Sequence, residues 1–162
     1  DNPKLNCRIT GLNKFSPRRI ILDKELKINL NSFIVKTINK YNTIIFYNKS
    51  SQKKLLFLKK KGALLVKVKL RIDKNLDLKE ILKKLYKLNC RYLLVEGGSY
   101  LTKSFLKQRL FNIFYLLKSN KKDPLKKNYK FFDSIDLLNK SFNNRTNITN
   151  ILGKDRIIQY KF

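Results

Sequence analysis

Histidine, tryptophan and methionine are absent from this chain of 162 residues, and cysteine occurs only twice. Without histidine, no His-based acid-base or metal chemistry is available, and Cys7 and Cys90 lie too far apart for a zinc-finger spacing. We expect both thiols to be reduced and to act as small buried hydrophobic side chains. A natural chain of this length carries at least its initiator methionine, so the missing methionine predicts a piece of a longer protein.

Glycine and proline are also scarce, at five and three residues, and long apolar runs are missing. No uninterrupted run approaches the ~20 apolar residues that span a bilayer. The opening DNPKLNCR is unlike a signal peptide, and no linker or internal repeat divides the chain. These absences predict one globular, cytoplasmic domain, for which 43% hydrophobic residues supply a core.

Acidic residues are few, with 11 Asp and Glu against 38 Lys and Arg, so the formal net charge is +27. A clustered basic face would indicate nucleic-acid binding. The lysines are instead spread from Lys4 to Lys161, and the runs at 58–62 and 118–130 are typical of solvated loops or helix faces. We expect weak attraction to polyanions and no specific nucleic-acid partner. A basic nucleic-acid-binding module remains an alternative function.

Apolar patterning predicts strands that alternate with helices. Strands are expected at 17–23, 42–47, 63–70, 91–98 and 111–117. Helices are expected within 50–62, where Gly62 is the left-handed cap, and at 77–89 and 99–109. The intervening 24–38 has no clean period and is predicted to be a loop, with a short extended piece around 32–35. This alternation indicates an α/β domain.

The sequence makes a specific prediction about the start of the helix at 77–89 and about the burial of the strand at 91–98. Asp77 is a good N-cap for its helix, and Glu80 stands three residues later as in a capping box. The apolar run before Glu96 is continuous, which is typical of a strand in a sheet that is covered on both faces.

The turn Glu96-Gly97-Gly98 stands between the predicted strand and the helix that follows it. Two glycines remove the β-carbons where a backbone approaches a ligand closely, and the first amides of a helix attract phosphate. Glu96 would then face the crevice where open α/β sheets bind ligands. The same three residues are equally compatible with a plain turn and a solvated acid. They are not the longer G-x-G-x-x-G fingerprint, so no Rossmann assignment follows.

Several ordered motifs together resemble one known family. The segments DNPKLNCR, PRRIILDKELKI, LDLKEILKKL, YLLVEGGSYLTKSFL and LGKDRIIQY occur in the order seen in the reductase domain of the bacterial bifunctional riboflavin-biosynthesis deaminase/reductase. The resemblance implies a dihydrofolate-reductase-like α/β fold, with a mostly parallel central sheet flanked by helices. It implies that 1–162 is one reductase domain, incomplete at its N-terminus with the first strand or strands missing, and without the zinc-dependent deaminase domain.

The resemblance also implies an activity, the NADPH-dependent reduction of 5-amino-6-(5-phosphoribosylamino)uracil to its ribityl product. Leu5, Arg8 and Glu96 would face this small-molecule substrate, with Arg8 suited to its phosphate. The residues implied at NADPH are Asp1, Lys24, Gly97, Gly98, Ser99, Tyr100, Leu101, Thr102, Lys103 and Ser104. Hydride transfer is the cofactor's own chemistry and needs no histidine, so no catalytic residue or metal is named. Glu96 could bind sugar hydroxyls or assist a proton transfer. The family implies a homodimer.

The chain departs from the family pattern in places. Lys24 replaces a common serine, Asn112 stands where the family has aspartate, and 118–130 replaces a conserved loop. We expect the isolated piece to be inactive. A sister reductase of the same fold, acting on another pterin- or pyrimidine-like substrate, is the second alternative.

Overall fold

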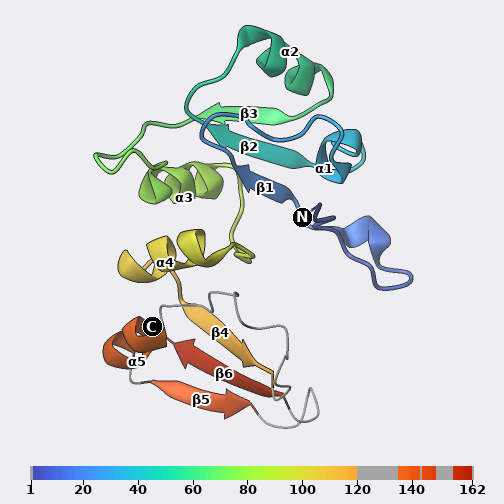
Figure 1. The fold of residues 1–162 in the computed structure, drawn as a ribbon. Helices are drawn as coiled ribbons and strands as arrows, with labels where there is room; N and C mark the ends of the chain where they lie inside the picture. The colour runs from blue at the N-terminus through green and yellow to red at the C-terminus, as the bar shows by residue number, and fades with distance from the viewer. Residues whose placement is uncertain (1, 120–134, 143, 149–154, 162) are drawn as a thin grey trace, which may run out of the picture. The chain divides into compact units, whose positions relative to one another are not determined.

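The computed structural model describes residues 2–119, 135–142, 144–148 and 155–161. It divides into two compact units, Asp1–Arg91 and Tyr92–Phe162, and each is described here by itself. Figure 1 shows one three-stranded sheet in each unit. Most of the predicted 118–130 segment lies outside the described residues.

The first unit is built on a parallel sheet of β1 (Arg19–Leu22), β2 (Thr43–Tyr47) and β3 (Leu64–Lys67), in the order β1-β2-β3. All three strands were predicted, and the parallel sheet confirms the α/β class. Their β-branched and large apolar residues suit a pleated sheet that is covered on both faces. Four of the five residues of β2, the central strand, are fully buried.

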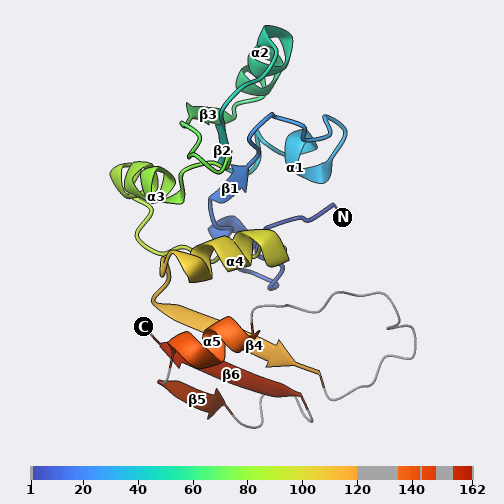
Figure 2. The same cartoon turned by 60° about the vertical axis from the view of Figure 1, so that its left-hand side comes forward.

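Helices cover both faces of this sheet. They are α1 (Phe33–Lys36), α2 (Gln52–Lys60) and α3 (Leu78–Lys87), preceded by a short 3-10 turn, η1 (Asn13–Phe15). In Figure 2, α1 and α3 lie on opposite sides of the sheet. One apolar cluster joins α1, α2 and the sheet and consists of Leu26, Val35, Ile38, Ile45, Leu58 and Ala63. Gly62 ends the α2 region at φ 94°, the left-handed conformation expected of it.

Helix α3 begins at the predicted N-cap. The Asp77 carboxylate accepts hydrogen bonds from the amides of Lys79 at 2.9 Å and Glu80 at 3.2 Å. The reciprocal half of the capping box is not formed, because the Asp77 amide donates to the Lys69 carbonyl and Glu80 accepts from the Lys69 amide. Glu80 thus ties the helix to the segment just after β3, a contact that depends on tertiary structure.

Replacing Asp77 by alanine is expected to lower the free energy of unfolding by about 1 kcal/mol, the usual cost of losing a helix N-cap. Two first-turn amides would lose their acceptor. Asp77→Asn is the control. It keeps an oxygen acceptor, so it should lower the free energy of unfolding by only a few tenths of the loss caused by Asp77→Ala. Urea denaturation of both variants measures the difference, and equal losses would show that the charge, not the hydrogen bonds, matters there.

The prediction of a loop with an extended piece around 32–35 is wrong, because Phe33–Lys36 forms α1. Both ends of this short helix are held by distant side chains. Asn2 Oδ1 accepts from the Phe33 amide at 2.9 Å, while Arg19 donates to the Ile34 and Thr37 carbonyls. A four-residue helix with β-branched residues is unstable alone, so these tertiary contacts decide its conformation.

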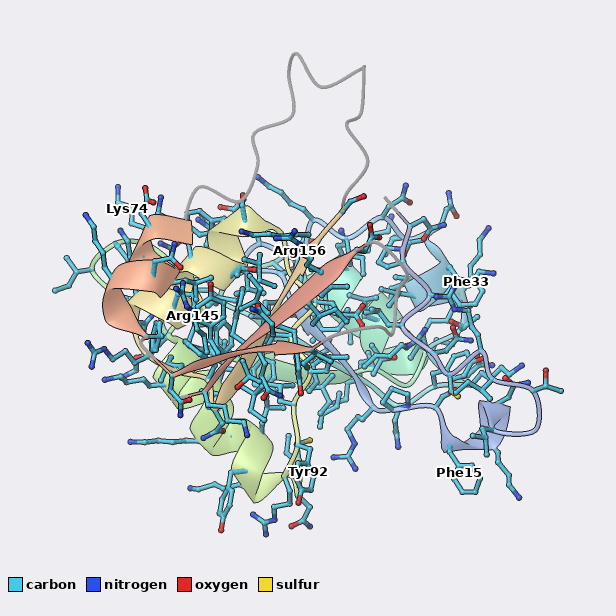
Figure 3. All side chains as sticks on the ribbon, turned by 90° about the horizontal axis from the view of Figure 1, so that it is seen from below. Phe15, Phe33, Lys74, Tyr92, Arg145 and Arg156 are labelled. Atoms are coloured by element: carbon cyan, nitrogen blue, oxygen red, sulfur yellow. The ribbon has the colours of Figure 1, made fainter. Side chains whose placement is uncertain are left out.

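The predicted strand at 91–98 is also wrong, because no regular element forms there in the described structure. A strand requires a neighbour for its backbone hydrogen bonds, and no described residue pairs with this segment. The apolar side chains Tyr92 to Val95 are exposed, Tyr92 by 97% and Leu94 by 78%. Tyr92 is labelled in Figure 3. The expected burial of this apolar run in a sheet covered on both faces is therefore wrong as well.

The second unit combines helices with an antiparallel sheet. Helix α4 (Ser99–Lys107) and strand β4 (Ile113–Lys118) match the predictions, while α5 (Ile135–Ser141), β5 (Arg145–Ile148) and β6 (Arg156–Lys161) complete it. The strand order is β4-β6-β5, and both pairings are antiparallel. Helix α5 packs on this sheet (Figure 2) through a core of Leu106, Leu138, Phe142 and Tyr160.

Both cysteines are free, as expected, but they are half-buried rather than fully buried. No helix in the described ranges is long and apolar enough to cross a membrane. Within the same residues, no three His, Cys, Asp or Glu side chains gather into a group that could hold a metal ion.

Candidate functional site

Arg8 lines a cavity of about 630 Å³ in the first unit. The residues around it come from the N-terminal segment and from the two stretches that lead into β1 and β2, so the cavity lies at the amino end of the parallel sheet. Three of its nine lining residues are basic and none is acidic. The lining consists of Asn6, Cys7, Arg8, Asn13, Lys14, Ser16, Lys40, Tyr41 and Asn42.

The N-terminal motif is attached to the unit at several points. Asn2 caps α1, and the Cys7 amide donates to Ser16 Oγ at 3.2 Å. Leu5 is half-buried and has a φ of 48°, in the left-handed region that leucine rarely adopts. This turn lies between the anchor at Asn2 and the cavity wall at Asn6, so Leu5 shapes the backbone that presents Arg8.

A buried arginine packs against Tyr41, one of the residues that line the cavity. Arg19 is only 2% exposed, and its guanidinium donates to Thr43 Oγ1, Thr37 Oγ1 and the carbonyls of Ile34 and Thr37. The guanidinium also lies 4.9 Å from the ring centroid of Tyr41. Burial lowers the pKa of Arg19, because loss of water disfavours the charged form. The hydrogen bonds compensate for that loss, and among the described residues no carboxylate forms an ion pair with Arg19.

Tyr41 connects this buried group to the cavity. Its hydroxyl accepts a hydrogen bond from Asn6 Nδ2 at 3.2 Å. The other amide atom of Asn6, Oδ1, is buried and has no partner among the described atoms. One face of Tyr41 therefore rests on the Arg19 guanidinium, while its hydroxyl fixes the N-terminal segment beside Arg8.

Lys24 lies at the other end of the parallel sheet, directly beyond the carboxyl end of β1. Its carbonyl accepts from the amides of Asn48 and Lys49, and its Nζ donates to the Lys74 carbonyl at 3.3 Å. Nearby, a hydrogen bond from Lys27 lowers the pKa of Glu25. The cavity beside Arg8 and the side chain of Lys24 thus lie toward opposite ends of the strands of this sheet.

The Glu96-Gly97-Gly98 turn belongs to the second unit and is exposed. Gly98 is the N-cap of α4 and offers no side-chain oxygen to the first amides of the helix, whereas Ser32, Ser51 and Asp77 cap α1, α2 and α3. The amides at the start of α4 are therefore available to an anion, which fits a dinucleotide phosphate.

The two glycines have different structural roles. A β-carbon on Gly97 would lie 2.8 Å from Leu101 Cδ2 and 3.0 Å from Leu101 Cβ, so Gly97 is needed for packing against the first turn of α4. A β-carbon on Gly98 would meet nothing within 4 Å. Only Gly98 leaves open space next to the helix start, so the idea that both glycines clear room for a ligand applies to Gly98 alone.

The remaining residues assigned to the cofactor follow on α4. Tyr100 is exposed, and Leu101, Thr102, Lys103 and Ser104 are half-buried. The hydroxyls of Thr102 and Ser104 donate to the Gly97 and Tyr100 carbonyls, at 3.4 and 3.0 Å, so they stabilise the turn and the helix. Asp1 lies outside the described residues. Leu5, Arg8 and Lys24 belong to the first unit, and Glu96 and the α4 residues to the second.

Sequence reasoning missed the residues that build the cavity around Arg8. Lys40 and Tyr41 lie far from the DNP motif along the chain, Lys14 follows Arg8 by six positions, and lysines occur throughout the sequence. No local pattern distinguishes these two lysines from the others. The pairing of β1 with β2 brings together the segments that precede these two strands, and those segments carry Lys14 and Lys40.

A family model and two curated relatives all relate this chain to RibD proteins. The family model described as the RibD C-terminal domain matches residues 1–118. Riboflavin biosynthesis protein RibD of Aquifex aeolicus (strain VF5) is 39% identical over 112 residues, and that of Actinobacillus pleuropneumoniae is 34% identical over 112 residues. Each alignment covers 69% of this chain and 29% of the relative.

Solved structures share the fold at low sequence identity. Acinetobacter baumannii RibD, form 1, aligns with a TM-score of 0.68 and 17% identity, covering 99% of this chain and 43% of that chain. A pyrimidine reductase-like protein of Corynebacterium diphtheriae aligns with a TM-score of 0.60 and 15% identity, covering 90% of this chain and 61% of that chain. The chain thus spans less than a third of the curated relatives and less than half of the RibD structure.

Proposed function

Because the chain belongs to the RibD C-terminal domain family, we propose that it is the reductase part of an enzyme of riboflavin biosynthesis. In this proposal it reduces 5-amino-6-(5-phosphoribosylamino)uracil with NADPH. The observation that carries the proposal is the family match over residues 1–118, which includes every residue assigned to substrate or cofactor. The fold shared with the RibD structure supports it.

The start of α4 is the part of the chain that best fits NADPH. Its first amides lack a side-chain cap, and Gly98 leaves space beside them. An anion at this position would satisfy those amides and interact favourably with the helix dipole. Lys24, at the carboxyl end of β1, is the second contact that we assign to the cofactor, where its ammonium would meet a phosphate. NADPH supplies the hydride, and the protein's task is to bind and orient.

Arg8 and Glu96 are the polar groups that we assign to the substrate. A guanidinium presents paired donors to a phosphate, so Arg8 is suited to the phosphate end of a phosphoribosyl group. Glu96 is exposed at the turn before α4, where its carboxylate can accept hydrogen bonds from sugar hydroxyls. Leu5 positions the backbone that leads to Arg8. A homodimer and a cytoplasmic location complete the proposal, on the strength of the family resemblance.

The test uses the full-length natural polypeptide to which this sequence belongs. NADPH oxidation is followed by absorbance with the aminopyrimidine substrate, and the ribityl product is identified by mass spectrometry. Substrate-dependent NADPH oxidation is expected. Absence of turnover would refute the proposal, and turnover of another pterin or pyrimidine alone would identify a sister reductase of the same fold.

Gly98→Ala is expected to raise the KM for NADPH about tenfold and to leave the free energy of unfolding within about 0.5 kcal/mol of the natural protein. The added methyl group meets no protein atom but would occupy the space beside the first amides of α4. Kinetics with varied NADPH, together with urea denaturation, measure both quantities. An unchanged KM would contradict a cofactor phosphate at this turn.

Gly97→Ala is the matched control for this prediction. Its methyl group would collide with Leu101, so it should lower the free energy of unfolding by about 1–3 kcal/mol, as overpacking usually does. The pair therefore separates a ligand contact at Gly98 from a packing requirement at Gly97.

A further inference from the structure

The cavity beside Arg8 has the chemistry of an anion site. Arg8, Lys14 and Lys40 line it, and no carboxylate does. Within the described ranges, ion pairs join Lys27 to Glu25 and Lys84 to Glu80, and none involves the three cations of the cavity. Three like charges around one cavity repel each other, and a bound anion would relieve that repulsion.

Each of the two lysines lies over an aromatic ring, while Tyr41 in the cavity wall contacts both Arg19 and Asn6. Lys14 Nζ lies 5.2 Å from the ring centroid of Phe15, and Lys40 Nζ lies 5.7 Å from that of Tyr41. These are weak contacts at exposed side chains, and an ammonium can leave them to meet a ligand. Tyr41 itself is fixed between Arg19 and Asn6.

The size of the cavity favours a small molecule. Its volume of about 630 Å³ lies within the range of ordinary small-molecule sites, roughly 300–1,000 Å³. A phosphate monoester carries close to two negative charges and several acceptor oxygens, which matches three cations better than a carboxylate does. A sugar phosphate would fill the remaining volume and reach the amide and hydroxyl groups of the wall.

We propose that this cavity binds the terminal phosphate of the substrate, and that Lys14 and Lys40 are phosphate ligands in addition to Arg8. The inference rests on the proposed reductase function and extends it to two residues outside the DNP motif. It also gives the phosphate end of the substrate a position at the amino end of β1 and β2. This end is opposite to Lys24, so the phosphates of substrate and cofactor are held apart.

The test compares Lys14→Ala, Lys40→Ala and the double variant of the full-length protein. Each single variant is expected to raise the KM for the phosphorylated substrate about fivefold to tenfold, and the double variant more than thirtyfold, as charge-assisted hydrogen bonds are lost. The KM for NADPH and the turnover of a dephosphorylated substrate should not change. Lys36→Ala and Lys53→Ala, at exposed lysines of α1 and α2, are the controls.

A binding measurement keeps the inference testable without turnover. Inorganic phosphate is titrated into each variant by calorimetry, and its affinity should fall in the Lys14 and Lys40 variants but not in the controls. Unchanged phosphate affinity would overturn the inference. If turnover of the phosphorylated substrate persists with its KM unaltered, the inference fails while the reductase function stands.

Two other outcomes distinguish the phosphate site from the reductase function and from a nucleic-acid interface. If the natural protein lacks NADPH-dependent activity but phosphate binding depends on both lysines, the reductase function fails and the phosphate site remains. If both lysine variants lose affinity for a single-stranded oligonucleotide but keep their affinity for phosphate, the cavity belongs to a nucleic-acid interface and the inference is overturned. Thermal melting of every variant confirms that these exposed substitutions leave the fold intact.

Discussion

Replacing Arg19 by alanine is expected to lower the free energy of unfolding by about 3–5 kcal/mol, because several buried acceptors lose their donor and a cavity is left. The carbonyls of Ile34, Thr37 and Tyr41 accept hydrogen bonds from its guanidinium, and each would be left without that donor. The truncated side chain would also leave a cavity between α1 and the start of β1. Since domains are stable by only about 5–15 kcal/mol, the loss is a large fraction of the total.

Graded substitutions separate the contributions of Arg19. Arg19→Met keeps most of the volume but no donor, and Arg19→Lys keeps the charge without the planar arrangement of five N–H groups. The free energy of unfolding of each variant should lie between that of the natural chain and that of Arg19→Ala. Guanidinium denaturation followed by circular dichroism measures the series.

The neighbouring Arg18 provides the control. It is exposed, and its guanidinium donates to the Leu88 carbonyl at 2.7 Å. Arg18→Ala should cost about 1 kcal/mol, the net value of one hydrogen bond. An equal cost at Arg18 and Arg19 would show that the buried network adds nothing to stability.

Arg8→Ala in the full-length protein is expected to lower kcat/KM for the phosphorylated substrate by a factor of about 10² to 10³, because a bidentate charge-assisted contact is lost. The unfolding transition should not change, since Arg8 is exposed and belongs to no apolar cluster. Arg8→Lys keeps the charge but loses the paired geometry, so a loss of roughly tenfold is expected. Steady-state kinetics at fixed NADPH measure both variants.

Two comparisons show whether the Arg8 effect comes from the phosphate. With a dephosphorylated substrate, Arg8→Ala and the natural protein should have similar kcat/KM. Arg71→Ala, at an exposed arginine of the turn after β3, should behave as the natural protein. A loss that is equally large for both forms of the substrate would contradict phosphate binding by Arg8 and indicate a different role.

Local patterns were sufficient for most elements of the first unit. The apolar strands β1 to β3, the capped helix α3 and the glycine end of α2 are each specified by residues within one short segment. Helix α1 could not be predicted in this way, because Asn2 and Arg19 hold its two ends. Likewise, no local pattern shows that residues 92–95 lack a neighbouring strand.

The arrangement of the candidate site could not be predicted from local sequence patterns either. Motif resemblance supplied Arg8, Lys24 and the Glu96-Gly97-Gly98 turn, but the cavity around Arg8 depends on contacts between distant segments. Tyr41 meets Asn6 across 35 positions of the chain. The separate roles of Gly97 and Gly98 depend on the side chain of Leu101, which composition and spacing do not reveal. Residue types can be read from a sequence, whereas their spatial partners cannot.

The exposed apolar segment from Tyr92 to Val95 has a consequence for how this polypeptide behaves in concentrated solution. Exposed apolar segments of high β propensity can pair with the same segment of another molecule. A net charge of +27 opposes this association, because neighbouring molecules repel each other. Added salt shortens the range of that repulsion, to about 3 Å at 1 M, and leaves the apolar attraction in place. Dilute buffers will therefore favour dispersed molecules, and high salt will favour precipitation.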